Sequence, residues 1–481
     1  MITFLISLVA LVVGYMVYGK FVERVFGPDD RLTPAVAKAD GVDFVVLPNW
    51  KVFMIQFLNI AGTGPIFGAI MGAKFGPAAY LWIVLGCIFA GAVHDYLCGM
   101  LSMRNDGAGQ PELIGLYLGH TTKRVMLVFS VFLLMMVGAV FVYSPALILG
   151  KMCSDGLTWV YIWCGIIFAY YLIATMLPID KIIGKIYPLF AVSMLFMAVA
   201  LMVVLFVKWP SLPELTDGIY GEGYSSPIFP ALFITIACGA ISGFHATQTP
   251  LMARCLKNEK MGRPIFYGSM ITEGLVALIW ATVSMYFFYG GAAEELGVPA
   301  TLQAPEVVTT VSQGWLGTFG GILALLGVVA APITSGDTAL RSARLIIAEF
   351  IHLDQRSVAK RFWICIPLFG ATMLLLFFNI ENPDGFNVIW SYFGWANQTL
   401  AVFTLWAITV YLVRAKKPYW ITFLPAVFMT VVCSSFLMIS KNAFGFDMMV
   451  GYGVGGAALI ISLAWFFRWY QQEKSRSSVQ K

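Results

Sequence analysis

Long apolar stretches and short polar connectors alternate along the whole chain. An apolar run of about 20 residues matches the hydrocarbon core of a bilayer, so each run predicts one membrane-spanning helix. The pattern therefore predicts an all-α integral membrane protein with about 13 spans. Their expected limits are 2–19, 52–72, 78–102, 124–149, 157–177, 186–207, 228–249, 265–290, 315–334, 361–379, 386–413, 418–440 and 446–468.

Two of these spans are interrupted by small and polar residues. Span 52–72 breaks at 59–65, and span 228–249 breaks at 239–248. Hydrocarbon cannot satisfy the backbone groups that such breaks free, so both segments must face the protein interior or a water-filled cavity. Paired interruptions by glycine and proline in corresponding parts of a membrane protein point to the binding site of a transporter.

The spacing of the two breaks predicts how the spans are arranged. With span 2–19 set aside, the broken spans are the first and sixth helices of a ten-helix core, 52–413. They would cross the membrane in opposite directions, as in a 5+5 inverted repeat. Residues 1–51 would add an extra helix and a cytoplasmic connector, and residues 414–481 would add two helices and a tail.

Basic residues mark one side of the predicted topology. All of the 30 Lys and Arg residues except Lys74, Lys151, Lys208 and Lys441 fall in alternate connectors or in the C-terminal tail. Connectors rich in Lys and Arg stay in the cytoplasm, which predicts an outer N-terminus and a cytoplasmic C-terminus. No basic segment precedes the first apolar run, so we interpret that run as a retained span and not as a signal peptide.

Composition narrows the class of protein further. The chain is 59% hydrophobic and 11% charged, whereas a soluble domain carries about 25% charged residues. The basic residues lie in connectors, so the net charge of +5 indicates no role in nucleic-acid binding. The 8 cysteines lack the spacing of a metal site and are interpreted as packing residues. We expect neither a resident metal nor another cofactor.

Polar side chains inside the spans are candidates for the binding machinery, because each is costly in hydrocarbon. His245 lies in the second break, where exposed N–H groups attract an anion such as a carboxylate. Its imidazole would donate to a substrate or carry a proton; a histidine paired with a nearby carbonyl group is the alternative. The candidates for substrate binding are Gly62, Thr63, Gly64, Ser242, Gly243, His245, Gln248, Asn397 and Gln398.

A second group suggests a coupling ion. Asp337 follows two hydroxyl residues at the predicted end of span 315–334. Hydroxyl and carboxylate oxygens would suit Na⁺, and a buried carboxyl group would alternatively carry H⁺. A helix cap at a membrane exit is the structural alternative. The expected ion-coupling residues are Asn59, Thr334, Ser335 and Asp337.

Three further residues, His94, Asp95 and Glu273, are candidates for a proton relay or a gate. His94 and Asp95 are neighbours on one helix and point in different directions, so we expect neither to contact the substrate. Glu273 would either pair with a hydroxyl group or supply a second carboxylate to the pathway.

Several motifs resemble those of the carbon starvation protein A (CstA) family. They are DGVDF at 40–44, GTGP at 62–65, GAVHD at 91–95, SGFHATQTPLMARCLKNE at 242–259, SGDTALRSARL at 335–345 and FNVIWSYFGWANQTLA at 386–401. The resemblance implies a LeuT-like secondary transporter of the amino acid–polyamine–organocation superfamily in the bacterial inner membrane. It also implies peptide uptake during carbon starvation, with pyruvate–proton symport in some relatives. The chain is similar to the short-form branch, and it has Ile55-Gln56 where longer members carry a His pair.

The sequence thus predicts a symporter, not an enzyme, that imports peptides or a small carboxylate such as pyruvate with H⁺ or Na⁺. Its partners would be membrane lipid and the transported solute. A passive channel would also fit the two breaks. An intramembrane hydrolase would use His and Asp residues within spans, but the chain contains no GxSxG or HExxH motif. The exact substrate and the oligomeric state are left open.

Overall fold

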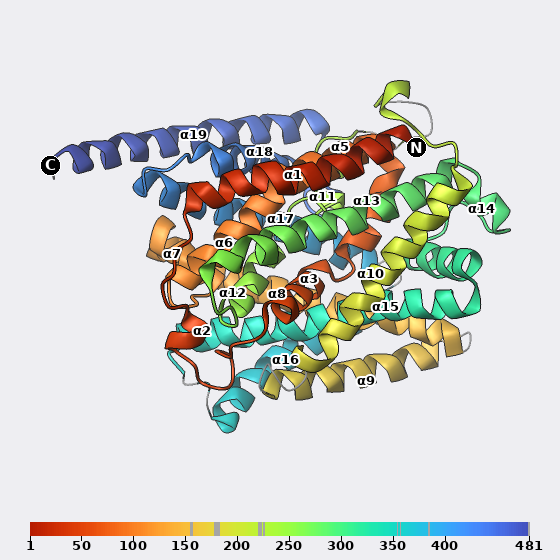
Figure 1. The fold of residues 1–481 in the computed structure, drawn as a ribbon, viewed down its shortest axis with the longest axis horizontal. Helices are drawn as coiled ribbons and strands as arrows, with labels where there is room; N and C mark the ends of the chain where they lie inside the picture. Colours follow the sequence, from red (N-terminus) through yellow and green to blue (C-terminus); the bar gives the residue numbers. More distant parts are fainter. Residues whose placement is uncertain are drawn as a thin grey trace.

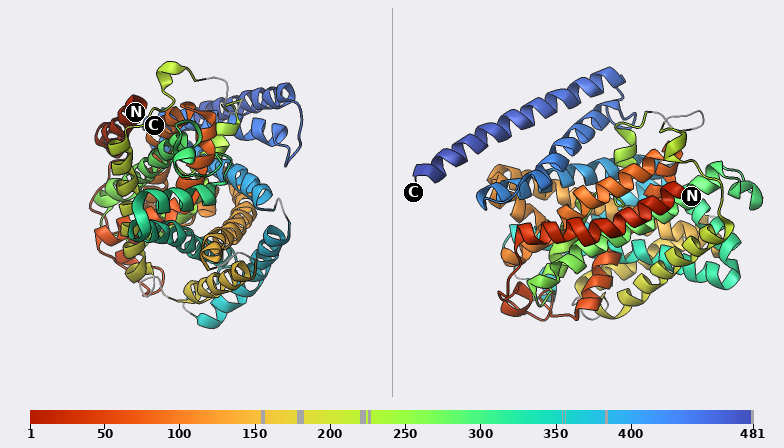
Figure 2. Two further views of the ribbon diagram at one scale, coloured as in Figure 1. Left: turned by 90° about the vertical axis from the view of Figure 1, so that its right-hand side faces the viewer. Right: turned by 45° about the horizontal axis from the view of Figure 1, so that its top comes forward.

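The computed structural model describes residues 1–153, 157–177, 183–219, 224, 227–353, 355, 357–382 and 385–479. In these residues all regular secondary structure is helical, as predicted. Most of the long helices lie side by side in one bundle and run roughly horizontally in Figure 1. α19 (Met448–Val479) lies on the outside of the bundle, and its C-terminal end projects beyond it (Figure 2).

Most of the predicted spans correspond to one helix or to consecutive helical segments. The single helices are α1 (Ile2–Phe26), α8 (His120–Cys153), α9 (Leu157–Met176), α10 (Ile183–Lys208), α16 (Val358–Glu381), α17 (Gly385–Arg414), α18 (Trp420–Ile439) and α19. The consecutive segments are α5 (Ala78–Gly86), η3 (Cys87–Gly91) and α6 (Ala92–Arg104), and η6 (Arg263–Tyr267) and α13 (Gly268–Tyr289). The connectors contain α2 (Pro34–Ala37), α7 (Gln110–Leu118) and α14 (Ala292–Glu295).

The predicted number of 13 spans is not confirmed. By length and composition, 10 helices among the described residues are able to cross a membrane, or up to 12 if each of two bent helix pairs is one span. The remaining predicted span, 228–249, consists of α11 (Ala231–Thr235) and α12 (Gly243–Ala253). Each of these helices is too short to cross a bilayer alone.

Both predicted breaks are present. α3 (Asn49–Ala61) ends at Gly62, whose φ of 47° favours glycine, and the chain continues at a bend of 51°. The second part of this span consists of η1 (Gly64–Gly68), α4 (Ala69–Gly72) and η2 (Ala73–Phe75). Residues 236–242 between α11 and α12 are not helical. The start of α3 lies beside the end of α12, where Leu47 donates its N–H to the carbonyl group of Cys255. The later part of the first broken span lies against the end of α11, so the broken helices run antiparallel.

α15 (Ala304–Phe350) differs most from its prediction. It bends by 77° between Ala304–Ile322 and Ala324–Phe350. The predicted limits 315–334 are therefore wrong, because the second part of the helix continues to Phe350. Hydropathy falls after Thr334, but the polar residues that follow are buried, since α8, α9 and α10 pack along this helix.

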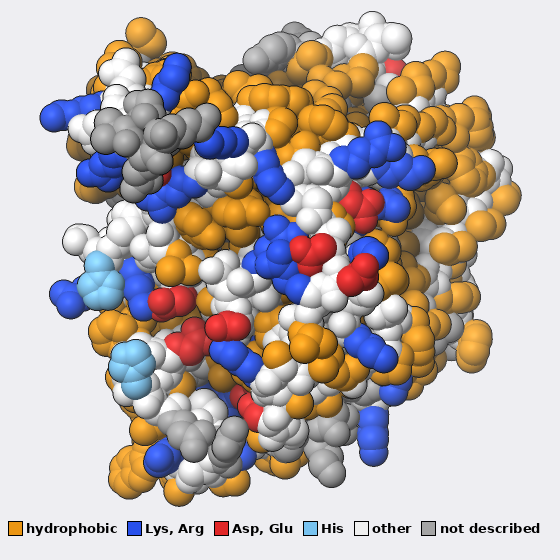
Figure 3. All heavy atoms as spheres, turned by 60° about the vertical axis from the view of Figure 1, so that its left-hand side comes forward, with side chains coloured by type: hydrophobic (Ala, Val, Ile, Leu, Met, Phe, Trp, Pro, Cys, Tyr) orange, Lys and Arg blue, Asp and Glu red, His pale blue; other side chains and the backbone are white. Residues whose placement is uncertain are grey.

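One end of the bundle carries a concentration of charged groups, which Figure 3 shows from that side. We call it the basic face and define it by residues 27–48, 254–263 and 414–419. Exposed basic side chains on it include Arg31, Lys38 and Lys260. The opposite face includes residues 208–219 and 290–303, where Lys208 pairs with Glu295 at 2.7 Å.

Candidate functional site

The two broken helices touch each other at their breaks. A Cβ atom on Gly64 would lie 2.3 Å from Cys238, and one on Gly68 would lie 2.9 Å from the carbonyl oxygen of Thr235. Distances under 3.0 Å are not tolerated, so only glycine allows this approach. Gly64 therefore closes the contact between the breaks in this conformation, and its role as a substrate contact stays a prediction.

Two neighbouring amides of α17 satisfy the backbone on either side of the second break. Asn397 Oδ1 accepts the N–H of Phe244 at 2.6 Å and the hydroxyl group of Ser242 at 3.0 Å, so it caps the start of α12. Gln398 donates to the carbonyl oxygen of Phe233 at 3.0 Å, near the end of α11. The sequence predicts a substrate carboxylate at the N-terminus of α12, and in the structure the amide oxygen of Asn397 occupies this position.

We expect Asn397→Ala to destabilise the protein by about 1–3 kcal/mol, because it leaves the N–H of Phe244 and the hydroxyl group of Ser242 buried without an acceptor. Thermal unfolding of the detergent-purified protein would measure the loss as a lower Tm. Ser391→Ala, at a half-buried serine on the same helix, is the matched control. An equal Tm for the two variants would contradict the capping role.

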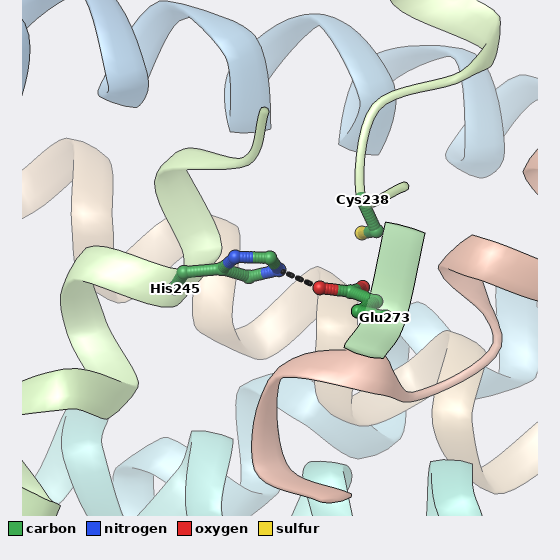
Figure 4. A group of neighbouring side chains, drawn as sticks. All are labelled: Cys238, His245 and Glu273. Carbon is green, nitrogen blue, oxygen red and sulfur yellow. Dashed lines mark ion pairs between the residues drawn. The ribbon is translucent and has the colours of Figure 1, made fainter. Parts of the chain in front are cut away.

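Four ionisable side chains form a chain across α6, α12 and α13. Asp95 Oδ1 lies 2.7 Å from His94 Nδ1, and Asp95 Oδ2 lies 2.8 Å from His245 Nδ1. His245 Nε2 lies 3.4 Å from Glu273 Oε2, as Figure 4 shows. All four side chains are fully buried. Cys238 also belongs to this group, since its sulfur lies within 4.8 Å of ligand atoms of His245 and Glu273.

The contact between Asp95 and His245 joins the relay candidates to the second break, and the expectation that neither His94 nor Asp95 contacts the substrate stays a prediction. Neighbouring helix residues do point in different directions. The carboxylate of Asp95 nevertheless reaches both imidazoles, because it has two acceptor oxygens and α12 packs directly against α6. His245 is therefore held by a carboxylate and not by the carbonyl group that the alternative interpretation assumed.

Polar residues of α15 meet the first break. Ser335 Oγ donates to the carbonyl oxygen of Leu58 at 2.8 Å, a carbonyl group that the end of α3 frees. Asp337 Oδ2 accepts the hydroxyl group of Tyr187 at 2.6 Å, and the same hydroxyl group lies 3.0 Å from the carbonyl oxygen of Thr334. Asp337 lies inside the helix, so the helix-cap interpretation is wrong.

Several buried polar atoms near the breaks have no hydrogen-bond partner among the described residues. A buried polar group without a partner is costly, and such groups mark the position of water, an ion or a solute. In α3 and the first break these atoms belong to Gln56, Asn59 and Thr63. Asp337 Oδ1 and Gln248 Oε1 lack partners too. These five residues are therefore available for a ligand, as are His245 Nε2 and both carboxylate oxygens of Glu273 at the second break. Of the five, Gln56 is the one that the sequence analysis did not choose.

A cluster of buried ion pairs lies at the basic face. Asp43, in the connector before α3, lies 3.4 Å from Arg341 Nη1 and 3.3 Å from Arg344 Nη2, and all three side chains are buried. Burial opposes ionisation of this carboxyl group, but Arg344 and Arg341 outweigh it and hold the pKa of Asp43 below its ordinary value. Arg341 also donates to the carbonyl oxygen of Ala174 at 2.6 Å, at the end of α9.

A cavity opens on the face opposite the basic face. A cavity of about 570 Å³ lies between the second half of the first broken span, α8 and the start of α15. Phe67 and Met71 line it beside the break, and Lys151 and Glu306 form an ion pair of 2.7 Å in its wall. This cavity thus lies on the face opposite the basic face, where the buried Asp43 cluster lies.

The structure brings some predicted site residues together and leaves others in separate groups. His94, Asp95, His245 and Glu273 form one cluster, and Ser335 and Asp337 lie on α15 near the first break. The sequence analysis missed Cys238, Tyr187, Asp43, Arg341 and Arg344. A signal for the arginines was available, because they are three residues apart within the 335–345 motif and so share one helix face.

Comparison with known proteins identifies related chains over most of the length. The model of a family described as carbon starvation protein CstA matches residues 1–160, 147–315 and 291–435. An uncharacterized membrane protein of Haemophilus influenzae is 46% identical over 339 residues, which cover 60% of this chain and 91% of that protein. The peptide transporter CstA of Escherichia coli is 24% identical, with 93% of this chain and 81% of that protein covered.

A relative with a different named substrate is the pyruvate/proton symporter BtsT of Escherichia coli, which is 25% identical over 90% of this chain and 80% of its own. Among solved structures, a manganese transporter of Eremococcus coleocola in complex with an aromatic bis-isothiourea compound has a TM-score of 0.59. It is 12% identical, and the match covers 91% of this chain and 99% of that one. This likeness shows a shared fold alone. The relatives named for an activity are transporters, not enzymes.

Proposed function

The chain belongs to the carbon starvation protein CstA family, and from this premise we propose that it is a secondary active transporter. It would import peptides or a small carboxylate such as pyruvate, together with H⁺ or Na⁺, during carbon starvation. Its spans and bacterial relatives make it a multi-pass protein of the bacterial inner membrane. The basic face would lie in the cytoplasm, with the N-terminus outside.

The observation that carries this proposal is the contact between two antiparallel broken helices inside the bundle. Such breaks supply free backbone groups and polar side chains where lipid is excluded, which is how transporters build a solute site. Thr63 and Gln248 have unpaired oxygens and would be the first substrate contacts. The other proposed contacts become available if the breaks separate: Gly62, Gly64, Ser242, Gly243, His245, Asn397 and Gln398.

The coupling ion would bind beside the first break. Asp337 would supply the charge, and Asn59, Thr334 and Ser335 would supply neutral oxygens, as a hard cation requires. Asp337 Oδ1 and the side chain of Asn59 are buried and unpaired, which supports this choice. His94, Asp95 and Glu273 would act on His245 and not on the substrate directly.

Transport would proceed by alternating access of a LeuT-like 5+5 core, residues 52–413, with residues 1–51 and 414–481 as additions. The open cavity at one face and the Asp43–Arg341–Arg344 cluster at the other support an outward-facing conformation. Opening of the solute site to the cytoplasm would require Asp43 to separate from Arg341 and Arg344.

Uptake by proteoliposomes tests the function. We expect radiolabelled pyruvate or a dipeptide to accumulate above its outer concentration under an imposed H⁺ or Na⁺ gradient, because only coupled transport concentrates a solute. Collapse of the gradient with an ionophore is the control. Uptake that only equilibrates would indicate a channel, and no uptake of either solute by folded protein would contradict the proposed substrates.

A further inference from the structure

A thiol, an imidazole and a carboxylate converge at the second break. We propose that Cys238, His245 and Glu273 form a binding site for a transition-metal dication of the Zn²⁺ or Co²⁺ type. Their ligand atoms all lie within 4.8 Å of one another, and all three residues are buried. Figure 4 shows them approaching from three different segments: the non-helical residues before α12, α12 itself and α13.

The distances fit a metal centre. Zn²⁺ binds nitrogen and oxygen at about 2.0–2.2 Å in a tetrahedral arrangement, which sets the two ligand atoms roughly 3.4 Å apart. His245 Nε2 and Glu273 Oε2 lie 3.4 Å apart. The sulfur lies within 4.8 Å of the other two ligand atoms, and Cys238 belongs to a turn in which Ala240 and Ile241 donate their N–H groups to the carbonyl oxygen of Ala237. A fourth position remains for water.

The imidazole of His245 is already oriented for this role. A carboxylate accepts hydrogen bonds, so the 2.8 Å contact of Asp95 with Nδ1 assigns the ring proton to Nδ1. The lone pair of Nε2 then points toward Glu273 and Cys238. Carboxylate–histidine–metal arrangements of this kind fix the ring and raise its basicity. Asp95 is thus a positioning residue, and it is itself held by His94 at 2.7 Å.

Among the described residues, the nitrogen and oxygen atoms that would bind the metal lack hydrogen-bond partners. The sulfur of Cys238 has two long hydrogen bonds, with Ser242 Oγ at 3.7 Å and Asn397 Nδ2 at 3.9 Å, which a metal would replace. His245 Nε2 and both carboxylate oxygens of Glu273 are buried and have no hydrogen-bond partner among the described residues. A buried carboxylate without a hydrogen bond is costly, and a dication would compensate it. The thiolate and the carboxylate together carry the two negative charges that balance the metal.

The ligand chemistry separates this site from the proposed coupling site. A thiolate and an imidazole prefer Zn²⁺ and similar ions, whereas Na⁺, Mg²⁺ and Ca²⁺ prefer oxygen ligands. Asp337 and its neighbours offer only oxygen. The metal site is therefore distinct from the proposed coupling site at Asp337. It shares His245 with the proposed substrate contacts, and it can be tested without a transport assay.

Binding of Co²⁺ to purified, metal-stripped full-length protein tests the proposal. We expect one Co²⁺ per chain and a thiolate-to-cobalt charge-transfer band in the near-ultraviolet spectrum. Cys238→Ser should lose the band, and Glu273→Gln should weaken binding at least about tenfold. Asp95→Asn should keep the band and weaken binding by about 10–100-fold. Cys433→Ser, at a buried cysteine of α18, is the matched control and should change neither.

A measurement on the unchanged protein guards against variants that fail to fold. Saturating Co²⁺ should slow the alkylation of Cys238 at least about tenfold, as a metal-bound thiolate is not free to react. Alkylation of Cys433, followed at the same time by mass spectrometry, should not change. Absence of the charge-transfer band, an unchanged band in Cys238→Ser, or equal alkylation of Cys238 with and without Co²⁺ would overturn the proposal.

Discussion

Asp337→Asn is expected to abolish gradient-driven uptake, down to the level of protein-free liposomes. Asparagine has nearly the same shape and keeps an oxygen that accepts the hydroxyl group of Tyr187, now 2.6 Å away. It removes the one negative charge in the proposed ion site. A coupled cation then has no charged ligand, so the gradient can no longer drive the solute, whereas the helix packing is retained.

Two controls make this result specific. Exchange of labelled for unlabelled substrate across the membrane without a gradient should survive in Asp337→Asn, because exchange requires no net movement of the coupling ion and the neutral amide resembles a carboxylate whose charge the ion has neutralised. Asp447→Asn, at an exposed acid near the start of α19, should accumulate substrate like the wild type. Normal accumulation by Asp337→Asn would move the coupling site elsewhere, with the relay residues Asp95 and Glu273 as the next candidates.

The sequence predicts the two breaks well because their signal is local. Glycine, proline and polar residues within an apolar run leave backbone groups that lipid cannot satisfy, and this requires no knowledge of neighbouring helices. Gly62 is an example, because its φ of 47° at the end of α3 favours the glycine that the sequence shows there. The all-α fold follows from the same kind of local evidence.

The end of α15 could not be predicted from hydropathy, because its polar residues are buried by protein. Asp337, Arg341 and Arg344 lower the hydropathy after Thr334, as a connector would. Tyr187 of α10, Ala174 of α9 and Asp43 of the connector before α3 pair with them, and these partners are far away in the sequence. A window of single-chain hydropathy does not distinguish a polar residue in water from one paired inside a bundle.

For the same reason, the contacts around the second break could not be predicted from the sequence. The sequence shows that α12 begins with free N–H groups, but it does not show that Asn397 of α17 already occupies them. Cys238 falls in an apolar run and resembles a packing residue until Glu273 and His245 are found beside it. Asp95 and His245 become partners only because α6 and α12 pack together.

Asp43→Asn is expected to open the basic face. The substitution leaves Arg341 and Arg344 buried without a negative partner, and removing one member of a buried ion pair costs about 3 kcal/mol or more. In the conformation in which this face is open, both guanidinium groups would be hydrated, so the cost falls on the closed conformation alone. A difference of this size shifts a two-state equilibrium by about 150-fold.

Cys255 provides a natural reporter of this opening. It is buried, and its carbonyl group accepts the N–H of Leu47, so the segment that carries Asp43 covers it. In detergent-purified Asp43→Asn, alkylation of Cys255 should be faster than in the wild type, whereas that of Cys433 should not change. Asp30→Asn breaks an exposed ion pair with Lys260 on the same face and should have little effect, since such pairs contribute at most about 1 kcal/mol. An unchanged rate at Cys255 would contradict the gate, and equal acceleration at both cysteines would indicate unfolding of the whole bundle.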